Sequence, residues 1–171
     1  MNTGILRLHA LEYHQTKTYG VAALFVAGNI VFPQLCHLAR LGGPTWLPIY
    51  FFTLVAAYKY GWRVGLLTAV ASPLVNSALF GMPAVAVLPA VLLKSALLAG
   101  AAGMAAARFR RATLPVLLGV ILAYQVAGTL GEWWLTGSFY AATQDFRIGL
   151  PGMLVQLLGG WWFINRLIRS L

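Results

Sequence analysis

The residue of greatest chemical interest in this sequence is Lys94, because it lies in the middle of a mainly apolar segment that runs from Met82 to Ala107. An ammonium group near the centre of a membrane costs at least ~3 kcal/mol, and it is tolerated mostly where it faces a bundle interior or a water-filled cavity. Glu132 lies in another apolar segment, and a lysine side chain is long enough to extend toward it. We therefore expect Lys94 to make a charge-assisted contact with Glu132 or with an anionic group of a ligand.

Further polar residues lie in stripes along the apolar segments, which indicates a shared polar interior. Gln125 and Glu132 are seven residues apart and share a helix face, and Asn76 lies one turn from Ser72. Gln156 belongs to a stripe of glycines. Taken singly, such amides also serve helix packing in lipid, so a purely structural role remains an alternative. The sequence predicts one binding cavity to which five residues contribute: Asn76, Lys94, Gln125, Glu132 and Gln156.

Aromatic residues gather at the expected outer boundary of this cavity. Trp and Tyr normally lie at membrane interfaces, although one or two of them could stack on a flat ligand, a role that we assign to Trp133 and Tyr140. Arg147 supplies a second cation at the cavity mouth, and Asp145, two residues away, is placed to neutralise it. The aromatic residues at this boundary are Trp46, Tyr50, Trp133, Trp134, Phe139 and Tyr140.

Catalytic and metal-binding motifs are missing from the sequence. It contains no phosphate-binding glycine loop, no His-Glu-x-x-His and no Gly-x-Ser-x-Gly. Three acidic residues in all are too few for a metal–carboxylate active site. Cys36 and His37 could form a ligand pair, but His9 and His14 are expected on the opposite side of the membrane. We expect no enzyme activity, no metal and no cofactor.

The composition is typical of an all-α membrane protein. Hydrophobic residues make up 60% of the chain and charged residues 9%, whereas about a quarter of a soluble domain is charged. About 20 apolar residues cross a bilayer as a helix, and a single helix over residues 46–80 would be ~50 Å long, beyond the ~30 Å core. We predict a bundle of six transmembrane helices: Thr18–Leu38, Trp46–Tyr58, Val64–Phe80, Ala84–Ala107, Leu114–Leu135 and Ile148–Leu167.

The basic residues indicate that both termini are cytoplasmic. Positive residues accumulate in cytoplasmic loops, and short clusters between apolar runs explain the net charge of +9 without a nucleic-acid partner. Residues 1–17 are expected to form a cytoplasmic or interfacial segment, with Ile5, Leu8 and Leu11 on a short surface helix, and residues 18–171 the transmembrane domain. The cytoplasmic side collects nine basic residues and the outer side two: Arg7, Lys17, Lys59, Arg63, Arg108, Arg110, Arg111, Arg166 and Arg169, against Arg40 and Arg147.

The segment Ala23-Leu-Phe-Val-Ala27 resembles the Ala-x-x-x-Ala motif of the substrate-binding (S) components of energy-coupling factor transporters. The resemblance covers roughly residues 18–167 and includes chain length, six spans, cytoplasmic termini and basic charge. It implies that Ala23 and Ala27 dock a transmembrane scaffold subunit. It further implies that the protein captures a small micronutrient, such as a vitamin, outside a prokaryotic cell (inner) membrane. Two cytoplasmic ATPases, acting through the scaffold, would then drive import.

A second interpretation stays open. A non-transporting six-span scaffold or assembly protein of cell-envelope synthesis would have the same composition. It would have no affinity for small molecules, and the contact between Lys94 and Glu132 would be structural.

Overall fold

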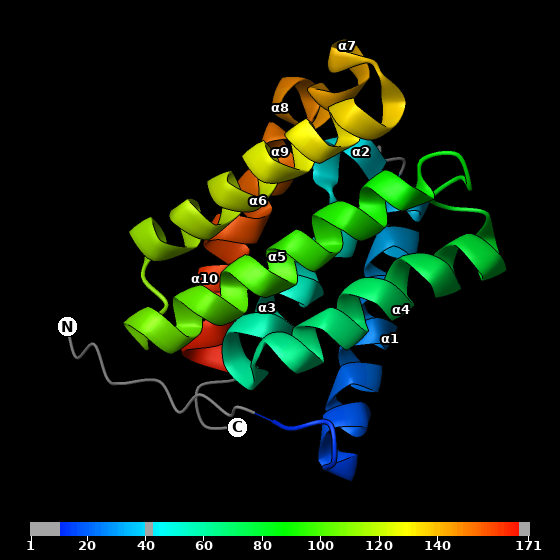
Figure 1. Ribbon diagram of the computed structural model, residues 1–171. Helices are drawn as coiled ribbons and strands as arrows, with labels where there is room; N and C mark the ends of the chain where they lie inside the picture. The colour runs from blue at the N-terminus through cyan, green and yellow to red at the C-terminus, as the bar shows by residue number, and fades with distance from the viewer. Residues whose placement is uncertain (1–10, 40–42, 168–171) are drawn as a thin grey trace.

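The computed structural model describes residues 11–39 and 43–167, and within these ranges the chain is helical without a β-strand. Four helices are long and apolar enough to cross a membrane, and they are the long ribbons of Figure 1: α1 (Thr16–Leu38), α4 (Trp62–Phe80), α5 (Leu88–Phe109) and α6 (Leu114–Thr136). Their bounds lie within a few residues of the predicted ones. The all-α fold class is confirmed, and the fold is that of a multi-pass membrane protein.

Shorter helical segments join the long helices and cover one end of the bundle. Between α1 and α4 lie α2 (Gly43–Trp46), the 3₁₀ turn η1 (Pro48–Tyr50) and α3 (Phe51–Tyr60). After α6 come α7 (Phe139–Ala142) and α8 (Gln144–Ile148), which lie together beside the end of α6 in Figure 1. The chain then runs as a helix in which α and π turns alternate: α9 (Leu150–Leu154), η2 (Val155–Gly159), α10 (Gly160–Trp162) and η3 (Phe163–Leu167).

The helical run at the predicted second span, Trp46–Tyr58, begins two residues later than predicted, at Pro48. Leu47 has a left-handed backbone, with φ of 47°, and Pro48 opens a new turn, so the helical segment is divided here. Proline lacks an amide donor and disfavours helical geometry in the residue before it. The helix that remains, α3, has ten residues and is therefore ~15 Å long, about half of a ~30 Å membrane core.

The last predicted span is also shifted. Ile148 ends α8, Gly149 separates the two helices, and the longer helical run begins at Leu150. Neither α3 nor this run is among the four helices that qualify by length and hydropathy. The count of six spans and the cytoplasmic position of both termini remain predictions.

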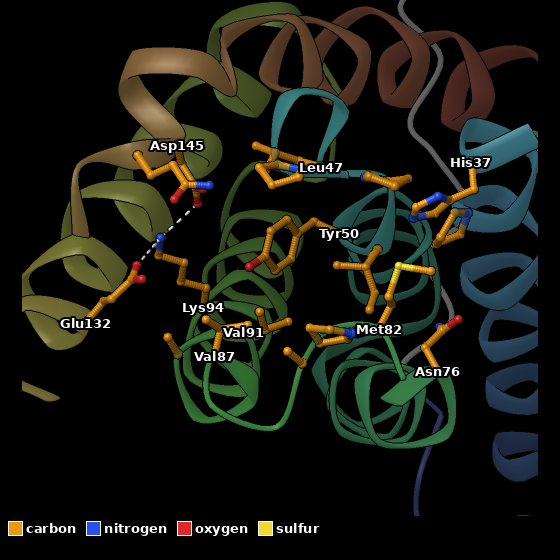
Figure 2. A pocket seen from close by; sticks show the side chains of 18 of the residues that line it. His37, Leu47, Tyr50, Asn76, Met82, Val87, Val91, Lys94, Glu132 and Asp145 are labelled. Carbon is orange, nitrogen blue, oxygen red and sulfur yellow. Dashed lines mark hydrogen bonds and ion pairs between the residues drawn. The ribbon is translucent and has the colours of Figure 1, made fainter. Parts of the chain in front are cut away.

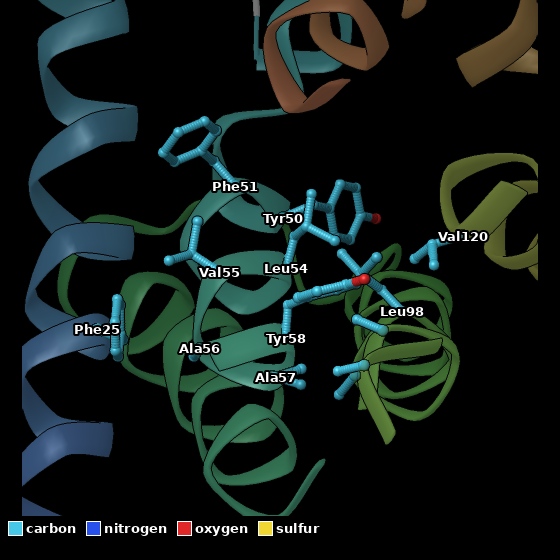
Figure 3. Packing of buried hydrophobic residues seen from close by; sticks show 14 of the residues in the cluster. Phe25, Tyr50, Phe51, Leu54, Val55, Ala56, Ala57, Tyr58, Leu98 and Val120 are labelled. Carbon is cyan, nitrogen blue, oxygen red and sulfur yellow. The ribbon is translucent and has the colours of Figure 1, made fainter. Parts of the chain in front are cut away.

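Helix α3 forms the centre of the hydrophobic core. Residues 54–58 have no exposed surface. Figure 3 shows α3 between Phe25 of α1 on one side and Leu98 of α5 with Val120 of α6 on the other. Because α3 is covered on all sides, its apolar sequence reflects burial in protein, which hydropathy cannot distinguish from burial in lipid.

The buried N-terminal end of α3 receives its hydrogen-bond acceptors from nearby chain segments. The first amides of a helix have no partner within the helix, and in an apolar environment each unsatisfied group is costly. The Phe51 amide donates to the Pro48 carbonyl. The Phe52 amide donates to Oδ1 of Asn29 on α1 at 3.2 Å. One side chain from a neighbouring helix thus caps the short helix.

The same asparagine connects three helices. Its Nδ2 donates to Oγ1 of Thr53 on α3 at 3.0 Å and to Oγ of Ser72 on α4 at 3.1 Å. Asn29 is fully buried, whereas Ala23 and Ala27 lie on the exposed side of α1. Helix α1 therefore directs a polar face with Asn29 inward and a face with the small residues Ala23 and Ala27 outward.

Side-chain hydrogen bonds also secure the opposite end of the bundle. Tyr58 donates its hydroxyl proton to the Arg111 carbonyl at 2.6 Å. Asn165 donates from Nδ2 to the Ala112 carbonyl at 2.8 Å. These bonds attach α3 and the C-terminal helical run to the connection between α5 and α6.

The start of the described chain lies against this same end. Residues 11–15 are not helical, and Leu11 is buried, with its amide donating to the Tyr60 carbonyl at 3.2 Å. Glu12 forms an ion pair with Arg63 at 2.8 Å. The prediction of a surface helix that includes Leu11 is wrong for the described part, because Leu11 is not helical and packs on the bundle. The other residues expected on that helix, Ile5 and Leu8, lie outside the described residues. Arg40 and Arg169 also lie outside them.

Replacing Asn29 by Leu should destabilise the fold, because the branched shape of the side chain is kept while the buried Phe52 amide loses its acceptor. A buried donor left without a partner costs about 1–3 kcal/mol. The measurement is thermal unfolding of the purified protein in detergent, with Leu24→Ala, at an exposed position on the same helix, as the control. An unfolding midpoint for Asn29→Leu equal to that of the control would contradict the capping role.

Candidate functional site

A cavity of about 420 Å³ lies at the N-terminal end of α3, where the short helix leaves space within the bundle. Small-molecule pockets typically measure about 300–1,000 Å³. Most of the wall is apolar and comes from α1, η1, the α4–α5 connection and α5. Figure 2 shows Lys94, Glu132 and Asp145 on one side of the cavity and His37 and Asn76 on the other. The polar side chains that line it are Gln34, His37, Tyr50, Asn76, Lys94, Glu132, Gln144 and Asp145.

Lys94 lies between two carboxylates at one side of this cavity (Figure 2). Its Nζ is 2.6 Å from Oε2 of Glu132 on α6 and 2.8 Å from Oδ2 of Asp145 on α8. The side chains of the three residues are 4%, 15% and 11% exposed, respectively. The expected Lys94–Glu132 pair is therefore present, and the cluster joins α5, α6 and α8. Because α5 begins at Leu88, Lys94 lies ~9 Å along the helix, nearer its end than the sequence indicates.

Asp145 is the site residue that the sequence reasoning missed. Its proximity in sequence to Arg147 predicts a local neutralisation, but the fold turns the carboxylate toward Lys94. A usable signal was present, since the chain has only three acidic residues and a buried ammonium requires partners. Tyr50 was likewise expected in the aromatic boundary, but it is 3% exposed and lines the cavity.

The residues expected at the mouth do not line the cavity. The Arg147 guanidinium lies 3.6 Å from the centre of the Tyr140 ring, and its Nη2 donates to the Tyr140 carbonyl at 3.0 Å. Trp133 is 46% exposed and packs edge-on against Phe139, with ring centres 5.3 Å apart. The Arg147 guanidinium thus stacks on the Tyr140 ring at the surface, which is a cation–π contact.

Gln125 and Gln156 are buried as expected, but in a separate polar cluster. The Tyr124 hydroxyl donates to Oε1 of Gln156 at 2.9 Å, and Nε2 of Gln125 donates to the Tyr124 hydroxyl at 3.1 Å. The Tyr124 ring lies 5.7 Å from that of Tyr50, which separates this cluster from the cavity. Two turns of α6 separate Gln125 from Glu132, about 10.5 Å along the helix, so residues of one stripe lie at different depths.

Asn76 lines the cavity at the side away from the ion cluster (Figure 2). Its Nδ2 donates to the carbonyls of Asn29 and Ser72, both at 3.0 Å. Since both partners are carbonyl oxygens, they determine which amide atom is the nitrogen. The remaining atom, Oδ1, is buried and has no hydrogen-bond partner among the described residues.

Gly128 allows Lys94 to reach its partners. A Cβ atom on this glycine would lie 2.5 Å from Cγ of Lys94, closer than side chains approach one another. The lysine side chain therefore crosses α6 over a residue without a side chain. Gly128 lies between Gln125 and Glu132 in the sequence, but the sequence alone does not predict that Lys94 of α5 packs against it.

Within residues 11–39 and 43–167, no three His, Cys, Asp or Glu side chains come together as metal ligands. Cys36 is buried in α1 as a free thiol, and His37 lines the cavity.

No family model, curated protein or solved structure matches this chain.

Gly128→Ala should displace the Lys94 side chain and destabilise the protein by about 1–3 kcal/mol, the usual cost of overpacking. Gly119→Ala is the matched control, because it lies on the same helix and a Cβ there meets no atom within 4 Å. The control should be neutral or more stable by up to ~1 kcal/mol, since alanine favours helices over glycine. Unfolding midpoints in detergent compare the two; equal effects would contradict the close approach of Lys94 to α6.

Proposed function

We propose that this protein is the substrate-binding (S) subunit of an energy-coupling factor importer, which captures a micronutrient outside a prokaryotic cell membrane. The observation that carries the proposal is the cavity of about 420 Å³ with a buried ion cluster in its wall. Buried charges inside a membrane bundle commonly mark the pathway or site of a ligand. The protein binds its ligand without chemical change, so it acts as a binding subunit and not as an enzyme.

The position of the cavity agrees with capture from the outer side. The cavity lies beside the α4–α5 connection and α8, at the opposite end of α5 from Arg108, Arg110 and Arg111. Basic connections favour the cytoplasmic side, so the proposal places the cavity near the outer surface. It also counts α3 and the run from Leu150 to Leu167 as the second and sixth crossings.

The outward face of α1 supports a docking role for Ala23 and Ala27. Both residues are exposed, and small side chains allow the close approach by which helices associate in lipid. In the proposal, a transmembrane scaffold subunit binds this face, and two cytoplasmic ATPases supply the energy for release of the ligand inside. The protein would supply the pocket and its partners the ATP hydrolysis.

One observation favours the alternative of a non-transporting scaffold protein. Lys94 already has two carboxylate partners within the protein, so the cluster can exist without a ligand. In that case its function would be to hold α5, α6 and α8 together. The scaffold alternative predicts that the purified protein carries no small molecule.

Ala27→Trp should prevent assembly with the scaffold and ATPases while leaving the fold intact, because a large side chain blocks close helix contact. The test is affinity purification of the tagged full-length protein from membranes of its source organism, followed by mass spectrometry of co-purified proteins. Wild type should retain ATP-hydrolysing subunits, and Ala27→Trp should lose them together with ligand uptake. Ala127→Trp, at an exposed position on α6, is the control.

Equal recovery of ATPases with Ala27→Trp and wild type would show that this face is not the docking surface. Recovery of no ATPase with wild type would contradict the importer assignment itself.

A further inference from the structure

The charge of the cavity wall is the first observation that restricts its ligand. The cluster contains one ammonium and two carboxylates, a formal charge of minus one. Among the described residues that line the cavity, Lys94 is the only lysine or arginine. His37 lies on the other side of the view in Figure 2. The wall therefore has an excess of negative charge in a mainly apolar setting.

The hydrogen-bonding groups of the cavity are the second observation, and they are independent of the charge. Asn76 donates both of its N–H protons to backbone carbonyls. The residue is 1% exposed, and its Oδ1 is buried without a hydrogen-bond partner among the described residues. Lys94 directs its protons to Glu132 and Asp145. Lys94 and Asn76 thus direct N–H protons to partners within the protein, while Glu132 and Asp145 each pair with Lys94 through one carboxylate oxygen.

We propose that the cavity binds a small organic cation, a molecule with a protonated amine or amidine group and an apolar remainder. The cationic end contacts Glu132 and Asp145, and the remainder lies against the apolar wall. The inference rests on the proposed capture function and names the chemical class of the ligand.

An anionic ligand fits the same geometry poorly. An anion that approaches Nζ of Lys94 meets the two carboxylates that lie 2.6 and 2.8 Å from that atom. Like charges at such distances repel strongly where little water screens them. Arg147, the other cation once expected at the site, lies on the Tyr140 ring and does not line the cavity. The structure thus favours a positive ligand over the negative one that Lys94 alone would suggest.

Three probes of similar size and different charge test the ligand class: benzylamine, benzyl alcohol and benzoate. Isothermal titration calorimetry of the detergent-purified full chain at pH 7 gives their affinities. Charge-assisted hydrogen bonds should make benzylamine bind about tenfold to a hundredfold more tightly than benzyl alcohol, with benzoate weakest. Benzoate binding as tightly as benzylamine would overturn the cation assignment and leave the capture function standing.

Variants of the acidic residues connect this preference to the cluster. Glu132→Gln and Asp145→Asn should each weaken benzylamine binding about tenfold and leave benzyl alcohol unaffected. Both retain one carboxylate for Lys94, so the fold is preserved; unfolding midpoints verify this. Glu12→Gln is the matched control, because Glu12 is the third acidic residue of the chain and pairs with Arg63 outside the cavity. It should bind benzylamine as wild type does.

Lys94→Met tests whether the site prefers a positively or a negatively charged ligand. Removal of the internal cation frees both carboxylates, so benzylamine should bind more tightly, whereas a site for anions would lose its affinity for benzoate. Unchanged benzylamine binding in both Glu132→Gln and Asp145→Asn would overturn the proposal whatever the behaviour of Lys94→Met. Absence of binding by all three probes would also overturn it, and the capture function is then judged separately by whether wild type co-purifies with a small molecule.

Discussion

The structure depends on one constraint, the need to satisfy backbone polar groups where a helix begins inside the bundle. Helix α3 starts at Phe51, a buried residue, and is only ten residues long, so its first amides lie within the protein. Asn29 supplies an acceptor for one of them and binds hydroxyl groups on α3 and α4 with its own protons. Because these bonds hold the short helix in place, the space beyond its end remains as a cavity.

The same requirement applies to charge at the wall of that cavity. Lys94 would be expensive in an apolar bundle without partners, and Glu132 and Asp145 provide them from two other helices. Gly128 lets the lysine side chain pass. Two carboxylates for one ammonium stabilise Lys94 and also leave an excess of negative charge. This excess is the basis of the proposed preference for a cationic ligand.

The sequence predicts the long helices well and the site in part. The spans assigned to α1, α4, α5 and α6 follow from apolar runs of membrane length, and the Lys94–Glu132 pair follows from the cost of isolated charge. The division at Leu47-Pro48 was visible as a proline, but hydropathy cannot tell whether the helix that follows, α3, is buried in protein or in lipid. Asp145 was assigned to its sequence neighbour Arg147, because only the packing of α7 on α6 and of α8 on α2 brings its carboxylate to Lys94. Gln125 and Gln156 share stripes with site residues yet lie around Tyr124, since a stripe determines a direction and not a depth.

The central claim is that the cavity holds a small molecule, and native mass spectrometry of the purified full chain tests it most directly. Wild type should carry one adduct of reproducible mass. Ala90→Trp, which fills the cavity from a wall residue that is 6% exposed, should lose this adduct, and Ala127→Trp on the exterior should keep it. Wild-type protein without any adduct, or the same adduct on wild type and Ala90→Trp, would contradict the account.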